Sequence, residues 1–147
     1  MKINELIDSE RGVFTIGPDA TIGDALRELF TKKISALPVV DEGGMLVGII
    51  SERDCVREAY NNPASFKERV IADVMTKDLI IALAEDDLDY VMNIMTQNSI
   101  RHIPILSGQK LTGIISIRDV VRGMVHKVES ENRYLKEYIA GKYETYQ

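Results

Sequence analysis

The chain has 147 residues, of which 45% are apolar and 28% charged, and its net charge is −5 at pH 7. This composition is typical of a globular protein with a sizeable core, and it argues against nucleic-acid binding, which needs a basic face. The sequence has no apolar run near the roughly 18 residues of a membrane span and no signal peptide after Met1, so we expect no membrane partner.

The first half of the chain predicts a strand, a helix, two strands and a second helix. Residues 13–16 form the first strand candidate. Thr21 is the expected N-cap of the first helix, because an apolar face at helical spacing follows it. That face comprises Ile22, Ala25, Leu26, Leu29 and Phe30. The later elements are strands at residues 37–40 and 45–50 around a turn at 42–44, then a helix from near Glu52 to Asn61-Asn62-Pro63.

The second half repeats this order of elements. Its first strand candidate spans residues 79–83, and Asp87 is the expected N-cap of the helix that follows. The apolar face of that helix comprises Leu88, Val91, Met92 and Met95. The later elements are strands at residues 103–106 and 111–115 and a helix that begins near Ile117. We therefore predict a β-α-β-β-α unit used twice.

The repeat is visible in the residues as well as in the elements. Residues 46–57 and 111–122 are identical at nine of twelve positions, which is a strong internal repeat. A unit of about 60 residues buries little surface by itself, so we expect the two sheets to pack against each other. The fold class is accordingly α+β or α/β, with two repeated units related by a pseudo-twofold axis.

The C-terminal segment departs from the repeat and predicts one long helix. A helix from Ile117 to about Ala140 would extend about 36 Å, which is longer than the second unit, and we expect it to end near Gly141. Its far end must then pack on the first unit, on a partner subunit or on another protein. Its apolar stripe comprises Val121, Met124, Val125, Val128, Leu135, Tyr138 and Ile139.

Both copies contain the pattern Gly-apolar-apolar-Ser-x-x-Asp, at residues 48–54 and 113–119. Together with the x-Pro-apolar strand before each pattern and the Val-Met-Thr segment between the units, it resembles the nucleotide-binding signature of CBS (cystathionine-β-synthase) domains. The resemblance covers roughly residues 8–128 and implies a stand-alone tandem pair, or Bateman module. It implies CBS domains at residues 8–62 and 79–128, a linker at 63–78 and a helical extension at 129–147.

In that family the two clefts between the domains hold AMP, ADP, ATP, NAD or S-adenosylmethionine, and two pairs usually form a flat homodimer. The resemblance thus implies a regulatory sensor that binds an adenine nucleotide, requires no other cofactor and acts through an unidentified protein. Two alternatives stay open. The chain could be an assembly module with vestigial ligand sites, or its ligand could be S-adenosylmethionine.

Asp54 and Asp119 lie where a strand passes into a helix, and a carboxylate there can accept both hydroxyls of a ribose. Their alternative role is capping, because an acidic residue is also favoured in the first turn of a helix. Ser51 and Ser116 could contact the ligand or simply N-cap the helices.

Arg101 and His102 are the main difference between the copies, because Ser35 and Ala36 occupy these places in the first unit. In the family, such residues contact the nucleotide held by the Asp of the other domain, so Arg101 and His102 are assigned to Asp54 and could grip phosphates. Their alternative is a solvated loop. The Asp54 site should therefore bind the more phosphorylated ligand, or bind more tightly. The first site comprises Ser51, Asp54, Ile80, Ile81, Ile100, Arg101, His102, Ile103 and Arg118, and the second comprises Val13, Phe14, Thr15, Ile34, Ser35, Ala36, Leu37, Arg53, Ser116 and Asp119.

The sequence does not predict an enzyme. Cys55 follows Asp54, but no basic residue is placed to activate it and Val120 stands in its place in the second copy, so it is interpreted as a small buried apolar residue. No spacing of a metal site is present. A lone cysteine, unable to form an internal disulfide, is also what a cytoplasmic protein would have.

Overall fold

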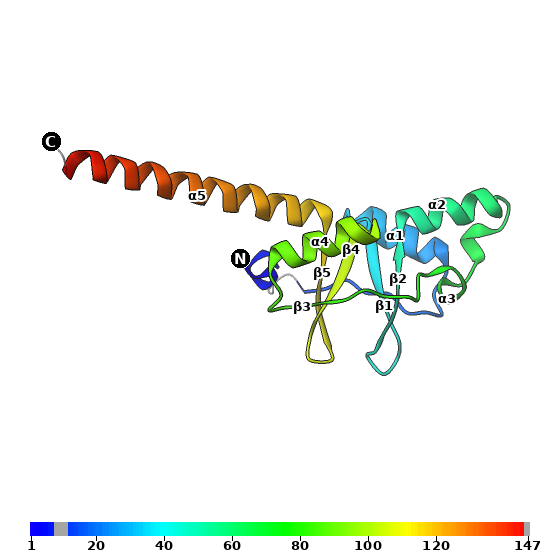
Figure 1. Ribbon diagram of the computed structural model, residues 1–147. Helices are drawn as coiled ribbons and strands as arrows, with labels where there is room; N and C mark the ends of the chain where they lie inside the picture. Colours follow the sequence, from blue (N-terminus) through cyan, green and yellow to red (C-terminus); the bar gives the residue numbers. More distant parts are fainter. Residues whose placement is uncertain (8–11, 146–147) are drawn as a thin grey trace.

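The structure is a computed structural model that describes residues 1–7 and 12–145, with side chains up to Gly141. Figure 1 shows two units side by side and a long helix that leaves the second one. The first unit contains α1 (Ile22–Lys32), β1 (Ala36–Val40), β2 (Leu46–Ser51) and α2 (Glu52–Asn61). The second contains β3 (Ala82–Leu83), α4 (Leu88–Asn98), β4 (His102–Ser107), β5 (Lys110–Ser116) and α5 (Ile117–Thr145). Short helical turns are η1 (Ile3–Leu6), η2 (Phe66–Glu68) and α3 (Ile71–Val74).

The sheets confirm the central hairpins and shorten the outer strands. β1 pairs antiparallel with β2, and the second sheet has the order β3-β4-β5 with β3 parallel to β4. The strand predicted at residues 13–16 is wrong: only Ile16 makes a bridge, to Val39, and residues 13–15 pair with no strand. The strand predicted at residues 79–83 is reduced to Ala82–Leu83.

The first helices of the two units begin in different ways. Thr21 caps α1 as predicted, in a reciprocal capping box with Asp24. Asp87 holds the N-cap position of α4, but its side chain makes no capping hydrogen bond and instead pairs with Lys2 Nζ at 2.9 Å. The N-cap position expected for Asp87 is therefore confirmed, but its side chain does not cap the helix.

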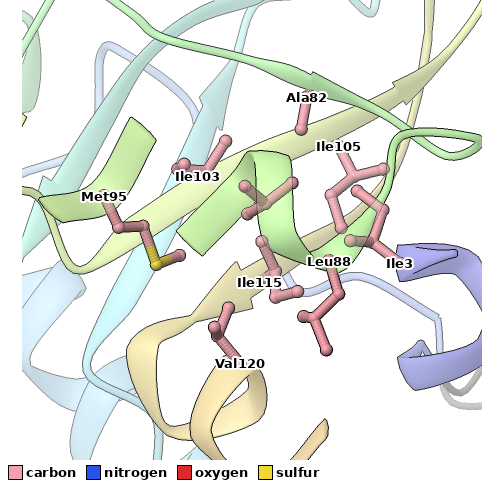
Figure 2. Packing of buried hydrophobic residues seen from close by; sticks show 9 residues of the cluster. Ile3, Ala82, Leu88, Met95, Ile103, Ile105, Ile115 and Val120 are labelled. Carbon is pink, nitrogen blue, oxygen red and sulfur yellow. The ribbon is translucent and has the colours of Figure 1, made fainter. Parts of the chain in front are cut away.

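The apolar faces of these helices pack into two separate cores. Phe30 was expected on the buried face of α1 but is 85% exposed, because at 100° per residue it lies about 80° from Ile22 around the helix. The first core comprises Ile22, Ala25, Leu29, Leu37, Val39, Ile50, Cys55 and Ile71. The second, shown in Figure 2, comprises Ile3, Ala82, Leu88, Val91, Met95, Ile103, Ile105, Ile115 and Val120.

Each core is completed by a short segment that lies outside the β-α-β-β-α pattern. Ile3 is 0% exposed within the second core (Figure 2), and Ile71 is 0% exposed within the first. The backbone contacts match: Leu88 N–H donates to Met1 O at 2.9 Å, and Ile22 N–H donates to Arg69 O at 2.8 Å. Part of the segment predicted as a linker is thus built into the first unit, and residues 1–7 are its counterpart on the second.

These two segments also explain the glycine of the repeated motif. A Cβ at Gly48 would collide with the Met75 side chain and come within 3.0 Å of Thr76 O. A Cβ at Gly113 would lie 3.1 Å from Ile7 Cγ2. The glycine is therefore needed for close packing of the neighbouring segment.

The helix α5 runs without interruption to Thr145, so the end expected near Gly141 is wrong. Its first turns pack on the second unit, where Lys127 Nζ contacts Asp89 Oδ2 at 3.1 Å. The rest extends away from both units (Figure 1), which rules out packing on the first unit. Among the described residues, no helix is long and apolar enough to cross a membrane.

Candidate functional site

The candidate site is built around the two carboxylates at the start of α2 and α5. Asp54 is the third residue of α2, and its Oδ2 accepts hydrogen bonds from Ser51 N–H at 2.9 Å and from Ser51 Oγ at 3.0 Å. Asp54 N–H in turn donates to Ser51 Oγ at 3.3 Å. Ser51 is therefore the N-cap of α2, in a capping box that fixes the direction of the Asp54 carboxylate.

The same arrangement recurs at Asp119. Its Oδ2 accepts from Ser116 N–H at 2.8 Å and from Ser116 Oγ at 2.9 Å, and Asp119 N–H donates to Ser116 Oγ at 3.2 Å. The serine and aspartate of each motif thus hold each other, as the capping alternative predicts. This does not use up the carboxylates, because each oxygen can accept more than one hydrogen bond.

The second oxygen of each carboxylate distinguishes the two halves. Arg57 Nη2 donates to Asp54 Oδ1 at 2.7 Å, and the Asp54 side chain is 7% exposed. In the second half, Arg122 Nη1 lies 3.9 Å from Asp119 Oδ1, and the Asp119 side chain is 32% exposed. A ligand hydroxyl could thus reach Asp119 directly, whereas at Asp54 it must share the carboxylate with Arg57 or displace it.

Arg57 and Arg122 were not among the predicted site residues. The signal that could have found them is the repeat itself, because an arginine follows the aspartate by three residues in both copies. Residues three apart on a helix are neighbours, so this spacing brings the guanidinium back to the carboxylate.

Ser35 and His102 were assigned to different sites, yet they are in direct contact. Ser35 Oγ lies 2.7 Å from His102 Nε2, so the two units meet between the starts of β1 and β4. Burial lowers the pKa of His102, while Glu52 and Asp119 oppose this by raising it. His102 therefore lies within the fields of both helix starts and favours its neutral form.

The predicted apolar walls divide into buried and accessible residues. Leu37 and Ile103 are fully buried in the two cores and Ala36 is nearly so, which leaves almost none of their surface open to a ligand. The side chains that remain partly or fully accessible are Val13, Phe14, Thr15, Ile34, Ile80, Ile81 and Ile100.

The predicted phosphate-binding arginines remain available. Arg53, Arg101 and Arg118 are exposed, and none of them makes an ion pair within the described part of the chain. Exposed guanidinium groups without a carboxylate partner can bind phosphate oxygens in a bidentate manner.

Cys55 is buried, and burial together with Asp54 and Glu52 raises the pKa of its thiol to about 11. At neutral pH it is therefore a thiol and a poor nucleophile. Within residues 1–7 and 12–141, no three side chains of the metal-binding types come together. The oriented carboxylates and the exposed guanidinium groups are groups that can bind hydroxyls and phosphates.

A family model described as CBS domain matches the chain twice, over residues 4–61 and 71–126. The curated relative "CBS domain-containing protein CBSX3, mitochondrial" of Arabidopsis thaliana is 38% identical over 129 residues. That alignment covers 85% of this chain and 63% of the relative, so the chain is similar to a part of that protein.

Solved structures agree with this similarity. A CBS-domain-containing protein from Agrobacterium tumefaciens is 35% identical and superimposes with a TM-score of 0.79. The superposition covers 84% of this chain and 99% of the other. The CBS domain pair of protein MJ0100, solved in complex with 5′-methylthioadenosine and S-adenosyl-L-methionine, is 26% identical, with a TM-score of 0.76. This superposition covers 86% of this chain and 98% of the other.

Proposed function

Because the chain belongs to the CBS domain family, we propose that it is a regulatory module that binds an adenosyl ligand and transmits its occupancy to a partner protein. The observation that carries this proposal is the pair of Ser-x-x-Asp motifs, each of which presents an oriented carboxylate at a helix start. The complex of the MJ0100 pair with two adenosine derivatives supports the adenosyl part of the ligand.

The carboxylates would bind the ribose. Both ribose hydroxyls can donate to an aspartate, and each such bond to a charged acceptor contributes roughly 1.5–3 kcal/mol. Asp119 is the more exposed of the two, whereas Asp54 is buried and paired with Arg57. Ligand binding at Asp54 would therefore weaken or break the contact with Arg57, which is a local change that occupancy could transmit.

The phosphates would lie at the Asp54 site. Arg101 and Arg118 are exposed and have no carboxylate partner among the described residues, whereas Arg53 alone is assigned to the Asp119 site. Two guanidinium groups suit a ligand with several phosphates, such as ADP, ATP or NAD. We therefore propose AMP, ADP, ATP or NAD at Asp54 and a less charged adenosyl ligand at Asp119.

S-adenosylmethionine is the second candidate ligand. It has no phosphate, and the MJ0100 pair was solved with it. If it is the true ligand, Asp119 and Asp54 still bind the ribose, but Arg101 and Arg118 are not needed. Charge reversal at these arginines separates the two candidates, because it would weaken nucleotide binding and leave S-adenosylmethionine binding unchanged.

A thermal-shift panel with AMP, ADP, ATP, NAD, S-adenosylmethionine and 5′-methylthioadenosine tests the proposal. A ligand at about 100 times its Kd should stabilise the protein by about 2.7 kcal/mol. Asp54→Asn and Asp119→Asn each keep a capping side chain but remove the charge, so each should weaken binding at its own site. Asp73→Asn, on an exposed residue of α3, is the matched control. No shift with any ligand would instead favour the assembly module.

We further propose that the module is a homodimer. Phe30 on α1 and Val56 and Tyr60 on α2 are large apolar side chains that are exposed in the single chain. The two helices that carry these side chains are in contact, and large exposed apolar patches are typical of interaction sites. A second copy of the same face is the simplest cover for it, since most oligomers are symmetric.

We also propose that the protein works in a reducing compartment such as the cytoplasm. Cys55 is a free, buried thiol, which such a compartment preserves. The regulated partner should then be found there, and affinity capture with and without nucleotide is the experiment that identifies it. A partner that binds equally in both conditions would argue against a sensor.

A further inference from the structure

The helix α5 carries an exposed apolar stripe on the face turned away from the second unit. Gly123 is buried against Leu6 and Leu88, and Lys127 pairs with Asp89, so these residues mark the inner face. The stripe is centred roughly 135° around the helix from them at 100° per residue. Its members are Val121, Val125, Val128, Leu135 and Ile139, which are between 52% and 63% exposed.

The stripe follows the heptad spacing of a coiled coil rather than that of a globular helix. From Val125 onward the apolar positions alternate by three and four residues, with Asn132 completing the series. This assigns Val125, Asn132 and Ile139 to the a positions and Val121, Val128 and Leu135 to the d positions. The series spans about 28 Å of helix.

The residue types at these positions indicate a coiled coil of two parallel helices. A single asparagine at an a position specifies a parallel dimer and its register. The β-branched a residues Val125 and Ile139 and the d residue Leu135 fit the same state, whereas the d residues Val121 and Val128 do not add to that preference. Asn132 is exposed in the single chain. In a parallel dimer it would meet the same asparagine of the other helix, whereas an antiparallel partner would place it against an apolar d side chain.

The flanking charges match the same arrangement. Glu131 falls at a g position and Lys136 at the following e position. In a parallel pair of identical helices a g residue lies beside the e residue of the next heptad on the other strand. Glu131 of each helix would therefore face Lys136 of the other, which gives two interhelical ion pairs.

From these observations we propose that α5 pairs with α5 of a second copy of this chain in a parallel two-stranded coiled coil, with Asn132 against Asn132 at its centre. The distal half of α5 extends away from both units (Figure 1), and such a partner would stabilise it, because most of the stability of a helix in a protein comes from packing of its apolar face. The proposal rests on the homodimer proposed above and adds α5 to the face of Phe30, Val56 and Tyr60 as a second surface that joins the subunits, independently of any ligand.

Disulfide cross-linking in the full-length chain tests the pairing directly. Val128→Cys, at a d position, should form an intersubunit disulfide in a glutathione buffer at least ten times faster than Ser130→Cys, at the outward f position. Both residues are exposed, so neither change disturbs a core. Cys55 is buried and stays reduced. Equal rates for the two variants would overturn the proposal, whatever the oligomeric state.

Charge reversal then tests the orientation. Sedimentation equilibrium should show that Glu131→Lys raises the dimer Kd severalfold, and that adding Lys136→Glu to it restores the wild-type value. Leu135→Glu should raise the dimer Kd at least tenfold, whereas Tyr134→Glu, exposed at an outward position, should not. If Leu135→Glu leaves the dimer Kd unchanged, the dimer is held elsewhere, for example by Phe30, Val56 and Tyr60, and the coiled coil is refuted. If the wild-type chain stays at its monomer mass of 16.5 kDa, there is no dimer, and the homodimer is refuted together with the coiled coil.

Discussion

The two halves of the molecule use the same Ser-x-x-Asp-x-x-Arg sequence to build two different sites. At Asp54 the arginine is bonded at 2.7 Å and the carboxylate is almost covered, whereas at Asp119 the corresponding distance is 3.9 Å and a third of the side chain is exposed. The comparison teaches that the motif determines the capping geometry, while the surroundings decide how accessible the carboxylate is.

A second difference lies in where along the chain each half finds the segment that completes its core. The second core contains Ile3, whose segment precedes the first unit in sequence. The first core contains Ile71, which follows that unit directly. The halves therefore look alike in structure but are assembled from contacts of very different sequence separation.

The largest effect should come from shortening these two isoleucines. Ile3→Ala and Ile71→Ala should each lower the free energy of unfolding by about 2–5 kcal/mol, because both side chains are fully buried and leave a cavity. Urea unfolding followed by circular dichroism measures both. Hydrogen exchange should show the loss of protection in β4 and β5 for Ile3→Ala and in β1 and β2 for Ile71→Ala.

The matched control for Ile3→Ala is Asn4→Ala, an exposed neighbour in the same turn, which should change stability by less than about 0.5 kcal/mol. If Ile3→Ala were equally neutral, residues 1–7 would not be part of the second unit. The two halves would then differ in their cores as well as in their sites.

Much of this fold could be predicted from the sequence, because the signals were local and repeated. Thr21 precedes a helical apolar face, and its capping box is present. The turn at Gly44 has a φ of 83°, a conformation that favours glycine. Ser51 and Ser116 are N-caps, which is one of the two roles predicted for them.

What could not be predicted depended on distant contacts. The segments 3–7 and 71–75 are identical only at the isoleucine, and both lie outside the β-α-β-β-α unit. They nevertheless share the pattern isoleucine, any residue, acid, apolar, apolar, which is the signal that could have connected them to the two cores. Asp87 occupies the cap position, but Lys2 draws its carboxylate away. The contact between Ser35 and His102 depends on how the two units meet, and no periodicity encodes that.

A smaller effect should separate the two arginines. Arg57→Ala leaves the Asp54 carboxylate covered and without its closest cation, so we expect a loss of about 1–2 kcal/mol in the free energy of unfolding. Arg122→Ala removes a longer, more exposed pair and should change stability by less than about 0.5 kcal/mol. Urea unfolding of both variants at the same salt concentration makes the comparison.

Lysine at the same positions is the control for charge alone. Arg57→Lys should recover only part of the loss, because an ammonium cannot reproduce the planar guanidinium geometry. Equal losses for Arg57→Ala and Arg122→Ala would mean that the two carboxylates have equivalent surroundings in solution. The difference in accessibility between the halves would then disappear.

The smallest effect should be a pH dependence that the second half contributes through His102. Its pKa is lowered in the folded protein, mainly by burial and further by Arg101, against the opposing charges of Glu52 and Asp119. The unfolded chain therefore binds the proton first as pH falls below about 6.5, so the stability associated with neutral His102 is present above that pH and is lost as the pH drops through the lower, folded value. The lowered pKa values of Asp24 and Asp87 affect stability at more acidic pH, and the raised pKa values of Lys2 and Lys127 affect it at alkaline pH.

Between pH 7.5 and 5.5, the free energy of unfolding measured in urea should therefore decline less for His102→Asn than for the wild type, with the exposed His126→Asn as control. An unchanged decline would mean that His102 is solvated in solution, and that its contact with Ser35 does not hold the two units together.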